Sequence, residues 1–143
     1  MEAYTFRKND AHRGIAKNPR GSVSTRRALS FNRKHITLSK RLSDELGVSV
    51  GSHIAFTYYE EKPDHIFIRA ADEPGDTKDI QYTLCLERRD KAVLKCSASA
   101  VINHVLSQVG ASRTCTCYVS PKPTLINGKN HYQILVSCPI KIN

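Results

Sequence analysis

Apolar and polar residues alternate over several short stretches of the first half of the chain, and this period of two predicts strands. Residues 28–38 are expected to form one strand, bent along its length. Residues 53–59 are expected to form a second strand. The polar residues 60–64 then connect it to a returning strand at 65–70. The sequence therefore predicts an antiparallel hairpin after the first strand.

A short helix is predicted between these strands. Leu42 and Leu46 are four residues apart, which places them on one helical face within residues 40–46. Ser39 precedes the segment as an N-cap residue, and Gly47 follows it where a left-handed residue ends a helix. The first half thus has the order strand, helix, strand, strand.

The second half repeats this order after residues 72–79, whose Asp, Glu, Pro and Gly break every pattern and predict a linker. A helix with an apolar stripe is predicted at 97–108, and Gly110 ends it. The remaining predicted elements are strands at 82–86, 92–96, 114–120 and 131–137 and a loop at 121–130 that contains the turn signal Asn127-Gly128. Residue identity between the halves is low, so the duplication is inferred from element order and from the two Gly-terminated helices.

The predicted fold class is α+β, mostly β: a small swapped-hairpin-like barrel from two β-α-β-β units, with an extended basic N-terminal arm. The arm covers residues 1–30 and the first unit 31–71. The linker at 72–79 separates it from the second unit at 80–143. Residues 31–143 are expected to form one compact domain, since 143 residues are an ordinary length for one domain.

Charge is concentrated at the N-terminal end of the chain. The whole sequence carries 22 Lys and Arg against 13 Asp and Glu. Residues 42–143 contain eleven of each sign, so the excess lies before them. The eleven basic residues up to position 41 are Arg7, Lys8, Arg13, Lys17, Arg20, Arg26, Arg27, Arg33, Lys34, Lys40 and Arg41. Such a block indicates an arm for an acidic partner, most often nucleic acid, although a solvated tail that aids solubility has the same composition.

Composition also indicates where the protein works. The longest uncharged run, residues 96–112, is shorter and more polar than a membrane span requires, so no membrane partner is expected. No apolar stretch follows Met1, which argues against secretion. Five cysteines cannot all pair, which favours a reducing compartment such as the cytoplasm.

Catalytic and metal chemistry are not expected. Cys115 and Cys117 lie two residues apart on one face of a predicted strand, where two thiols can ligate a soft metal. No second pair or His cluster completes a zinc site, so small buried core residues are the better interpretation. No nucleophile with its activating base and no glycine-rich phosphate loop is present. We therefore expect neither an enzyme nor a cofactor.

Residues 35–56 resemble the swapped-hairpin module of AbrB-type transition-state regulators and antitoxins. The resemblance rests on Ile36, Leu38, Leu42, Leu46-Gly47-Val48, Gly51, Ile54 and Phe56, and the strand at 66–69 also fits. Two positions depart from the family pattern: Ser39, where Pro is usual, and Ser52, where Asp is usual. Both positions shape turns.

The resemblance implies a barrel of two interleaved copies that binds DNA with basic residues near the first strand and the helix start. Carried to this sequence, those positions are Arg33, Lys34, Lys40 and Arg41. The second half has Ser97-Ala-Ser99 at its helix start, so it lacks the corresponding basic cluster. If that half is a divergent copy, one chain supplies both copies, and a homodimer is possible but not required.

Two functions remain open from the sequence. In the first, the chain is an AbrB-like regulator in a bacterial or phage-infected cytoplasm, and its basic residues contact the phosphates of DNA or another nucleic acid. In the second, it is a non-enzymatic structural component of a large assembly, such as a virion, a capsid or a ribonucleoprotein, and its arm threads into a neighbouring protein. Some family members use this fold for protein contacts, which keeps the second function open.

Overall fold

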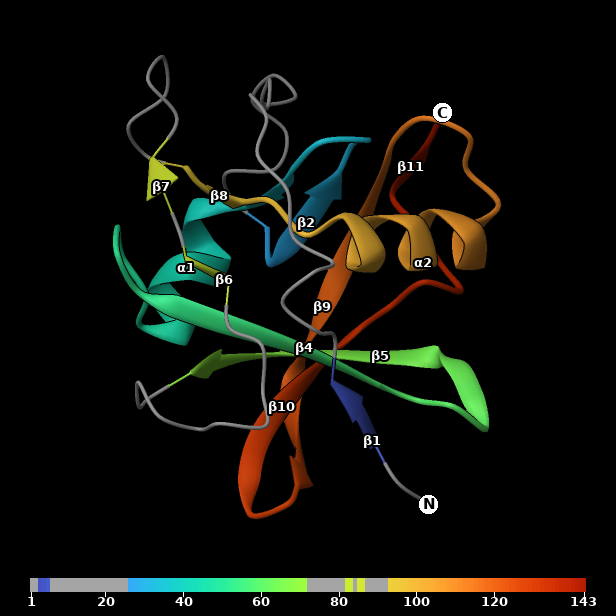
Figure 1. Cartoon of the computed structure of the whole chain (residues 1–143). Coiled ribbons are helices and arrows are strands. Elements are labelled where there is room, and N and C mark those ends of the chain that lie inside the picture. Colours follow the sequence, from blue (N-terminus) through green and yellow to red (C-terminus); the bar gives the residue numbers. More distant parts are fainter. Residues whose placement is uncertain (1–2, 6–25, 72–81, 84, 87–92) are drawn as a thin grey trace.

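The structure is a computed structural model of the whole chain, and it describes residues 3–5, 26–71, 82–83, 85–86 and 93–143. Within these residues the protein is mostly β, with two short helices and a curled, half-barrel sheet (Figure 1). The elements are β1 (Ala3–Thr5), β2 (Ala28–Phe31), β3 (Ile36–Leu38), α1 (Lys40–Leu46), β4 (His53–Tyr59), β5 (Lys62–Ala71), β6 (Tyr82–Thr83), β7 (Cys85–Leu86), β8 (Leu94–Cys96), α2 (Ser99–Val109), β9 (Cys115–Ile126), β10 (Lys129–Ile134) and β11 (Lys141–Ile142).

The sheet interleaves the two halves of the chain. Its strand order is β1-β4-β5-β10-β9-β2-β3-β8-β7, and every pair is antiparallel. Two further strands pair outside this path, β11 with β9 and β6 with β4. Because β6 and β7 are close in sequence but pair with strands from opposite parts of the order, the sheet curls back on itself. In Figure 1, α1 lies at the left and α2 at the right of the view.

One apolar core fills the inside of the curl. Strands from both halves contribute fully buried side chains, among them Phe31, Ile54, Phe56, Ile66 and Ile134. The helices add the stripes that the sequence predicts: Leu42 from α1, and Val101, Ile102, Val105 and Leu106 from α2. Burial of side chains of this size stabilises the fold by about 1.5–3 kcal/mol each.

Both helices end as predicted. α1 covers residues 40–46, and the Ser39 side chain accepts a hydrogen bond from the Leu42 N–H at its start. Gly47 and Gly110 end the two helices in the left-handed region, with φ of 72° and 74°. α2 begins at Ser99, two residues later than predicted.

The prediction of one bent strand over 28–38 is wrong, because two antiparallel strands, β2 and β3, occupy this segment. A turn between them is stabilised by the Asn32 side chain, whose Oδ1 accepts hydrogen bonds from the N–H groups of Lys34 at 2.8 Å and His35 at 2.7 Å. Asparagine commonly closes turns through such bonds. In the sequence, the polar run at 32–35 interrupts the apolar alternation, which moves from positions 29 and 31 to positions 36 and 38.

The predicted loop at 121–130 is also wrong in extent. β9 continues to Ile126 through Pro121 and Pro123, and only Asn127 and Gly128 form the turn. Their φ values of 51° and 76° confirm the predicted Asn-Gly hairpin turn. β9 tolerates the prolines because this part of it pairs only with β10 among the described strands, leaving its other edge free of a ladder.

The sheet includes parts of the range assigned to the N-terminal arm. β1 pairs with β4, and β2 already begins at Ala28. The predicted linker at 72–79 lies outside the described residues. Among the helices of the described part, neither is long and apolar enough to cross a bilayer.

Candidate functional site

The eleven basic residues singled out in the sequence divide into three groups. Those that lie outside the described residues are Arg7, Lys8, Arg13, Lys17 and Arg20. Those on or near β2 and α1 are engaged with other groups of the protein: Arg26, Arg27, Lys40 and Arg41. Arg33 and Lys34 lie in the turn between β2 and β3, where both side chains are exposed.

Arg27 is part of the structure rather than of an open surface. Its guanidinium forms an ion pair with Glu45 and donates to the carbonyl oxygens of Val119 at 3.4 Å and Ser120 at 2.9 Å. The same group lies over the ring of Tyr132, 5.6 Å from its centre. With these partners satisfied and only 13% of its side chain exposed, Arg27 is not available to a phosphate.

Lys40 and Arg41 begin α1 but are offset by acidic residues one turn later. Lys40 Nζ lies 3.2 Å from Asp44, and Arg41 Nε lies 3.9 Å from Glu45. Both pairs are exposed, where such contacts contribute at most about 0.5 kcal/mol to stability. Their main effect is to leave this helix face of mixed charge. Arg26, near the start of β2, is half-buried, with its guanidinium 6.0 Å from the Tyr118 ring centre.

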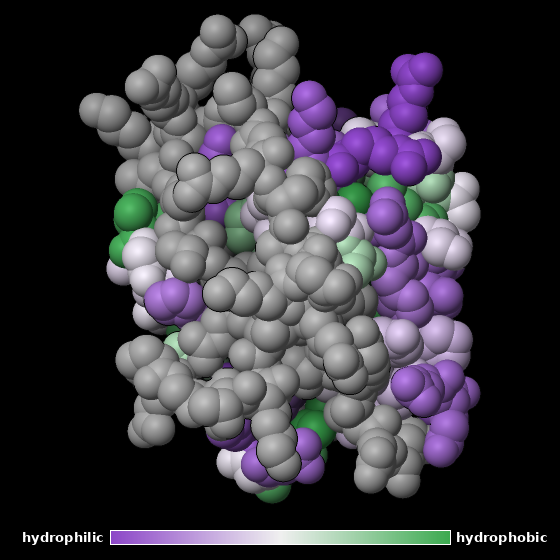
Figure 2. Space-filling view, in the orientation of Figure 1, coloured by the Kyte–Doolittle hydropathy of each residue, from purple (hydrophilic) through white to green (hydrophobic). Residues whose placement is uncertain are grey.

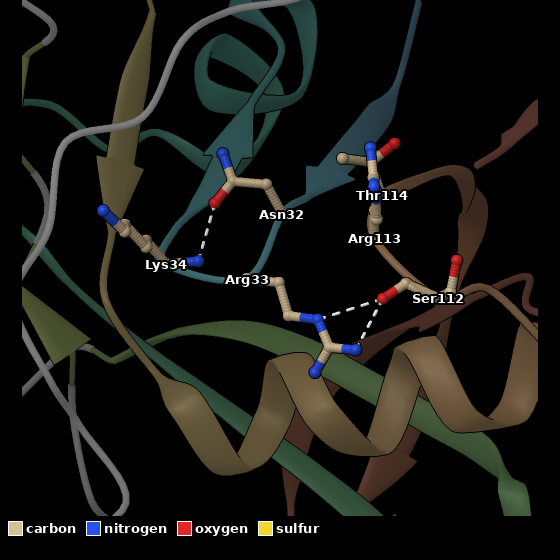
Figure 3. A pocket seen from close by; sticks show the side chains of 6 residues that line it. All are labelled: Asn32, Arg33, Lys34, Ser112, Arg113 and Thr114. Atoms are coloured by element: carbon tan, nitrogen blue, oxygen red, sulfur yellow. Dashed lines mark hydrogen bonds between the residues drawn. The ribbon is translucent and has the colours of Figure 1, made fainter.

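Arg33 and Lys34 line an open pocket of about 630 Å³ together with a residue that the sequence did not single out, Arg113. One side of the pocket is the β2–β3 turn, and the other is the segment between α2 and β9 (Figure 3). Its lining residues are Asn32, Arg33, Lys34, Ser112, Arg113 and Thr114. None of these six is acidic, so the pocket has a net positive charge.

Arg33 connects the two sides of this pocket by hydrogen bonds. Its Nε and Nη2 donate to the Ser112 carbonyl oxygen at 3.0 and 2.6 Å. In Figure 3 the guanidinium points toward Ser112, while the Lys34 side chain extends away from it. Lys34 and Arg113 are exposed, and no acidic partner of either is found among the described residues. The Arg33 guanidinium is thus bound within the protein, whereas the side chains of Lys34 and Arg113 are open to solvent.

The segment that carries Arg113 is fixed by the last residue of the chain. The N–H groups of Ser112, Arg113 and Thr114 all donate to the Asn143 carbonyl oxygen, at 3.2, 2.8 and 3.2 Å. The Asn143 N–H donates in turn to the Thr114 carbonyl oxygen at 2.8 Å. These backbone donors are therefore occupied, and a ligand in the pocket meets side chains.

Arg113 belongs to a basic half that the charge balance of residues 42–143 conceals. Residues 42–90 hold five basic and eleven acidic residues, whereas residues 91–143 hold six basic and no acidic residue. The neutrality of the body is thus an average of two opposite segments. Figure 2 shows strongly hydrophilic side chains at its upper right, where Figure 1 places the C-terminus and the β2–β3 turn. A charge count in shorter windows identifies this signal from the sequence.

The cysteines form no metal centre among the described residues. No group of three His, Cys, Asp or Glu side chains lies together there. Cys115 and Cys117 are buried, and their thiols share a hydrogen bond. That bond, with burial, raises the pKa of the Cys115 thiol, and the same bond lowers the pKa of Cys117. Both side chains are part of the core cluster, which fits the interpretation as small core residues.

Comparison with known proteins gives no relative: no family model, no curated protein and no solved structure matches the chain. The function must therefore be argued from the residues and their arrangement. The side chains that line the pocket are cationic or form hydrogen bonds. Their chemistry is complementary to that of an anion.

Proposed function

We propose that the chain is a nucleic-acid-binding protein, a regulator of the AbrB-like type, whose basic pocket contacts the phosphate backbone. The observation that carries this proposal is that Lys34 and Arg113 line one open pocket that has no acidic residue. Arg33 connects the two sides of this pocket by its bonds to Ser112, which is 79 residues away in the sequence. The proposed interface omits Arg27, which its structural contacts occupy.

The N-terminal arm extends the proposed interface. Between residues 7 and 20 the sequence has five basic residues and one acidic residue, Asp10. A nucleic acid that lies in the pocket gains further phosphate contacts from such a segment, and electrostatic contacts of this kind supply most non-specific affinity. A small-molecule anion would gain no such benefit, which favours a polyanion as the ligand.

We further propose that the two halves are copies of one swapped-hairpin unit. Each has the order strand, helix, hairpin, and each helix ends with the same pair of backbone bonds around its left-handed glycine. β3 pairs with β8 about the centre Thr37↔Lys95, and β5 pairs with β10 about the centre Phe67↔Gln133. Equivalent strands pairing antiparallel with each other is the arrangement that a two-fold axis between two copies produces.

This duplication supports a chain that acts as a monomer, because one molecule supplies both copies of the unit. The sequence before β8 contains Arg88, Arg89 and Lys91 together with Glu87 and Asp90, and these residues lie outside the described part of the chain.

The test is the salt dependence of binding to a mixed-sequence 30-base-pair DNA duplex, measured by fluorescence anisotropy with the full chain. With about six phosphates neutralised, log affinity falls against log salt with a slope on the order of −5. Replacing Lys34 and Arg113 with Gln removes two contacts and makes the slope less negative by about 2. The matched control is Lys62→Gln, an exposed lysine at the start of β5, which leaves the slope unchanged.

The opposite results are equally informative. No duplex binding at low salt contradicts the proposal and favours the structural role, in which the arm threads into a neighbouring protein of an assembly. Binding with an unchanged slope in the double variant shows that the nucleic acid lies elsewhere on the protein. A circular-dichroism melt of each variant verifies that the exposed substitutions leave the fold intact.

A further inference from the structure

The β9–β10 hairpin extends beyond the sheet as a two-stranded ribbon. β9 pairs with β2 only at residues 115–118, and β10 pairs with β5 only at residues 132–134. Residues 121–131, which we call the ribbon, are therefore paired with no other described strand. In Figure 1 the ribbon projects at the lower end of the molecule, away from the two helices.

One face of the ribbon is attached to the body, and the other is open. Ile126 and His131 are buried, and the His131 ring packs edge-on against Phe67 with 6.4 Å between ring centres. The opposite face carries the cross-strand pair Leu125↔Asn130, and 70% of Leu125 is exposed. Packing on one side holds the ribbon in place, so the open face is presented in a fixed orientation.

The ribbon is basic and is a poor template for another strand. Lys122 lies in a bulge where residues 120–122 oppose only Gln133, and Lys129 follows the turn. No acidic residue occurs anywhere from residue 91 onward. Pro121 and Pro123 remove two N–H donors from β9, which discourages the addition of a strand from a protein partner. Charge and proline together point to an anionic partner that is not a β-strand.

We propose that the ribbon enters a groove of duplex DNA while the basic pocket holds the backbone. This inference rests on the proposed function and adds the element that contacts base edges. A two-stranded ribbon fits the major groove, which is about 12 Å wide. β9 begins directly after Thr114 of the pocket and continues to Ile126 beside the ribbon tip, so a single strand connects the pocket with the ribbon.

On the open face, Asn130 and Leu125 have complementary roles. An asparagine amide donates to and accepts from a base edge, and an apolar side chain contacts the thymine methyl group. Lys122 is exposed in the bulge beside this face and supplies a cation for a phosphate. The sequence contains these residues but does not indicate that they project together.

The experiment places a photoreactive benzoylphenylalanine at Leu125 of the full chain and irradiates it with the 30-base-pair duplex. The matched control carries the same group at Val50, which is 54% exposed and precedes β4. We expect crosslinks to DNA bases from position 125 and none from position 50. A crosslink from position 125 to a second copy of the chain, or to no molecule, overturns the inference.

A second measurement separates the ribbon from the pocket. The double variant Lys122→Gln with Asn130→Ala is expected to weaken duplex binding on the order of tenfold, the size of one lost base contact and one lost phosphate contact. If this variant binds like the unmodified chain while the Lys34 and Arg113 variant loses affinity, the ribbon inference fails and the proposed function stands. If neither the unmodified chain nor any variant binds the duplex, the proposed function itself fails.

Discussion

Ser39 shows how much one small side chain does in this fold. Its Oγ accepts hydrogen bonds from the Leu42 N–H at 3.2 Å and the Ala28 N–H at 3.1 Å, and its hydroxyl donates to the Arg26 carbonyl oxygen. The bond with Leu42 caps α1, and the bonds with Ala28 and Arg26 hold the start of β2 against the start of this helix. A proline, which is usual here in the AbrB-type pattern that residues 35–56 resemble, could not form these bonds. Ser39 therefore connects the start of α1 to the start of β2.

Replacing Ser39 with Ala is expected to lower the free energy of unfolding by about 1–2 kcal/mol, because the buried N–H of Ala28 and the cap of α1 both lose a partner. Urea denaturation followed by circular dichroism measures the change. The control is Ser107→Ala on the exposed face of α2, expected to change the stability by less than about 0.5 kcal/mol. Equal stability of the two variants would contradict the structural role of Ser39.

At the scale of elements, the end of α2 sets the position of the pocket. Gly110 has φ of 74°, and its N–H donates to the Ser107 carbonyl oxygen while the Ala111 N–H donates to that of Leu106. The chain then turns directly into Ser112 and Arg113. A residue that disfavours the left-handed conformation strains this turn and shifts the side of the pocket that carries Arg113.

Gly110→Ala is therefore expected to cost about 1–2 kcal/mol in the free energy of unfolding, since an alanine is strained at positive φ. A new Cβ meets nothing within 4 Å, so the cost comes from the backbone alone. Gly110→Asn is the control, because asparagine adopts this conformation more readily and recovers part of the loss. Thermal melts of the three proteins give the order Gly, Asn, Ala; an alanine variant as stable as the glycine protein would contradict the argument.

Elements whose signals are local were predictable, and those that depend on partners were not. The cap at Ser39, the glycines that end the helices and the Asn127-Gly128 turn were all predicted. The β2–β3 turn was missed because the polar run at 32–35 fits a bend in one strand as well as a turn, and only the pairing of Leu29 with Leu38 decides between them. The length of β9 was missed because Pro121 and Pro123 argue against a strand unless one edge is free, and only the sheet order shows that it is.

At the scale of the whole molecule, charge is divided into three segments rather than two. A basic N-terminal segment is followed by an acidic one from 42 to 90 and a basic one from 91 to 143. The interleaved sheet brings the first and third together, since β2 pairs with β9. The basic pocket lies at this junction, with residues 32–34 from the first segment and residues 112–114 from the third.

Neutralising the arm tests this arrangement in the full chain. Replacing its five basic residues up to position 20 with Gln is expected to bring the salt slope of duplex binding from about −5 toward about −2, the value for the two or three remaining contacts. Hydrogen-exchange or circular-dichroism measurements verify that the body is unchanged. An unaltered slope would show that the arm does not contact nucleic acid and would favour its insertion into a protein neighbour.

The sequence by itself determined the mostly β class, the positions of both helices, the hairpin turn at Asn127-Gly128 and the basic N-terminal excess. These depend on periodicity, caps and composition, which act over a few residues. Only the tertiary structure decided that Arg27 is held by Glu45 and that Arg113 lines the same pocket as Arg33 and Lys34. The physical reason is that β2 and β9, which are far apart in the chain, pair with Phe31 opposite Cys115. The register of these two strands follows from packing of the shared core and not from any local pattern.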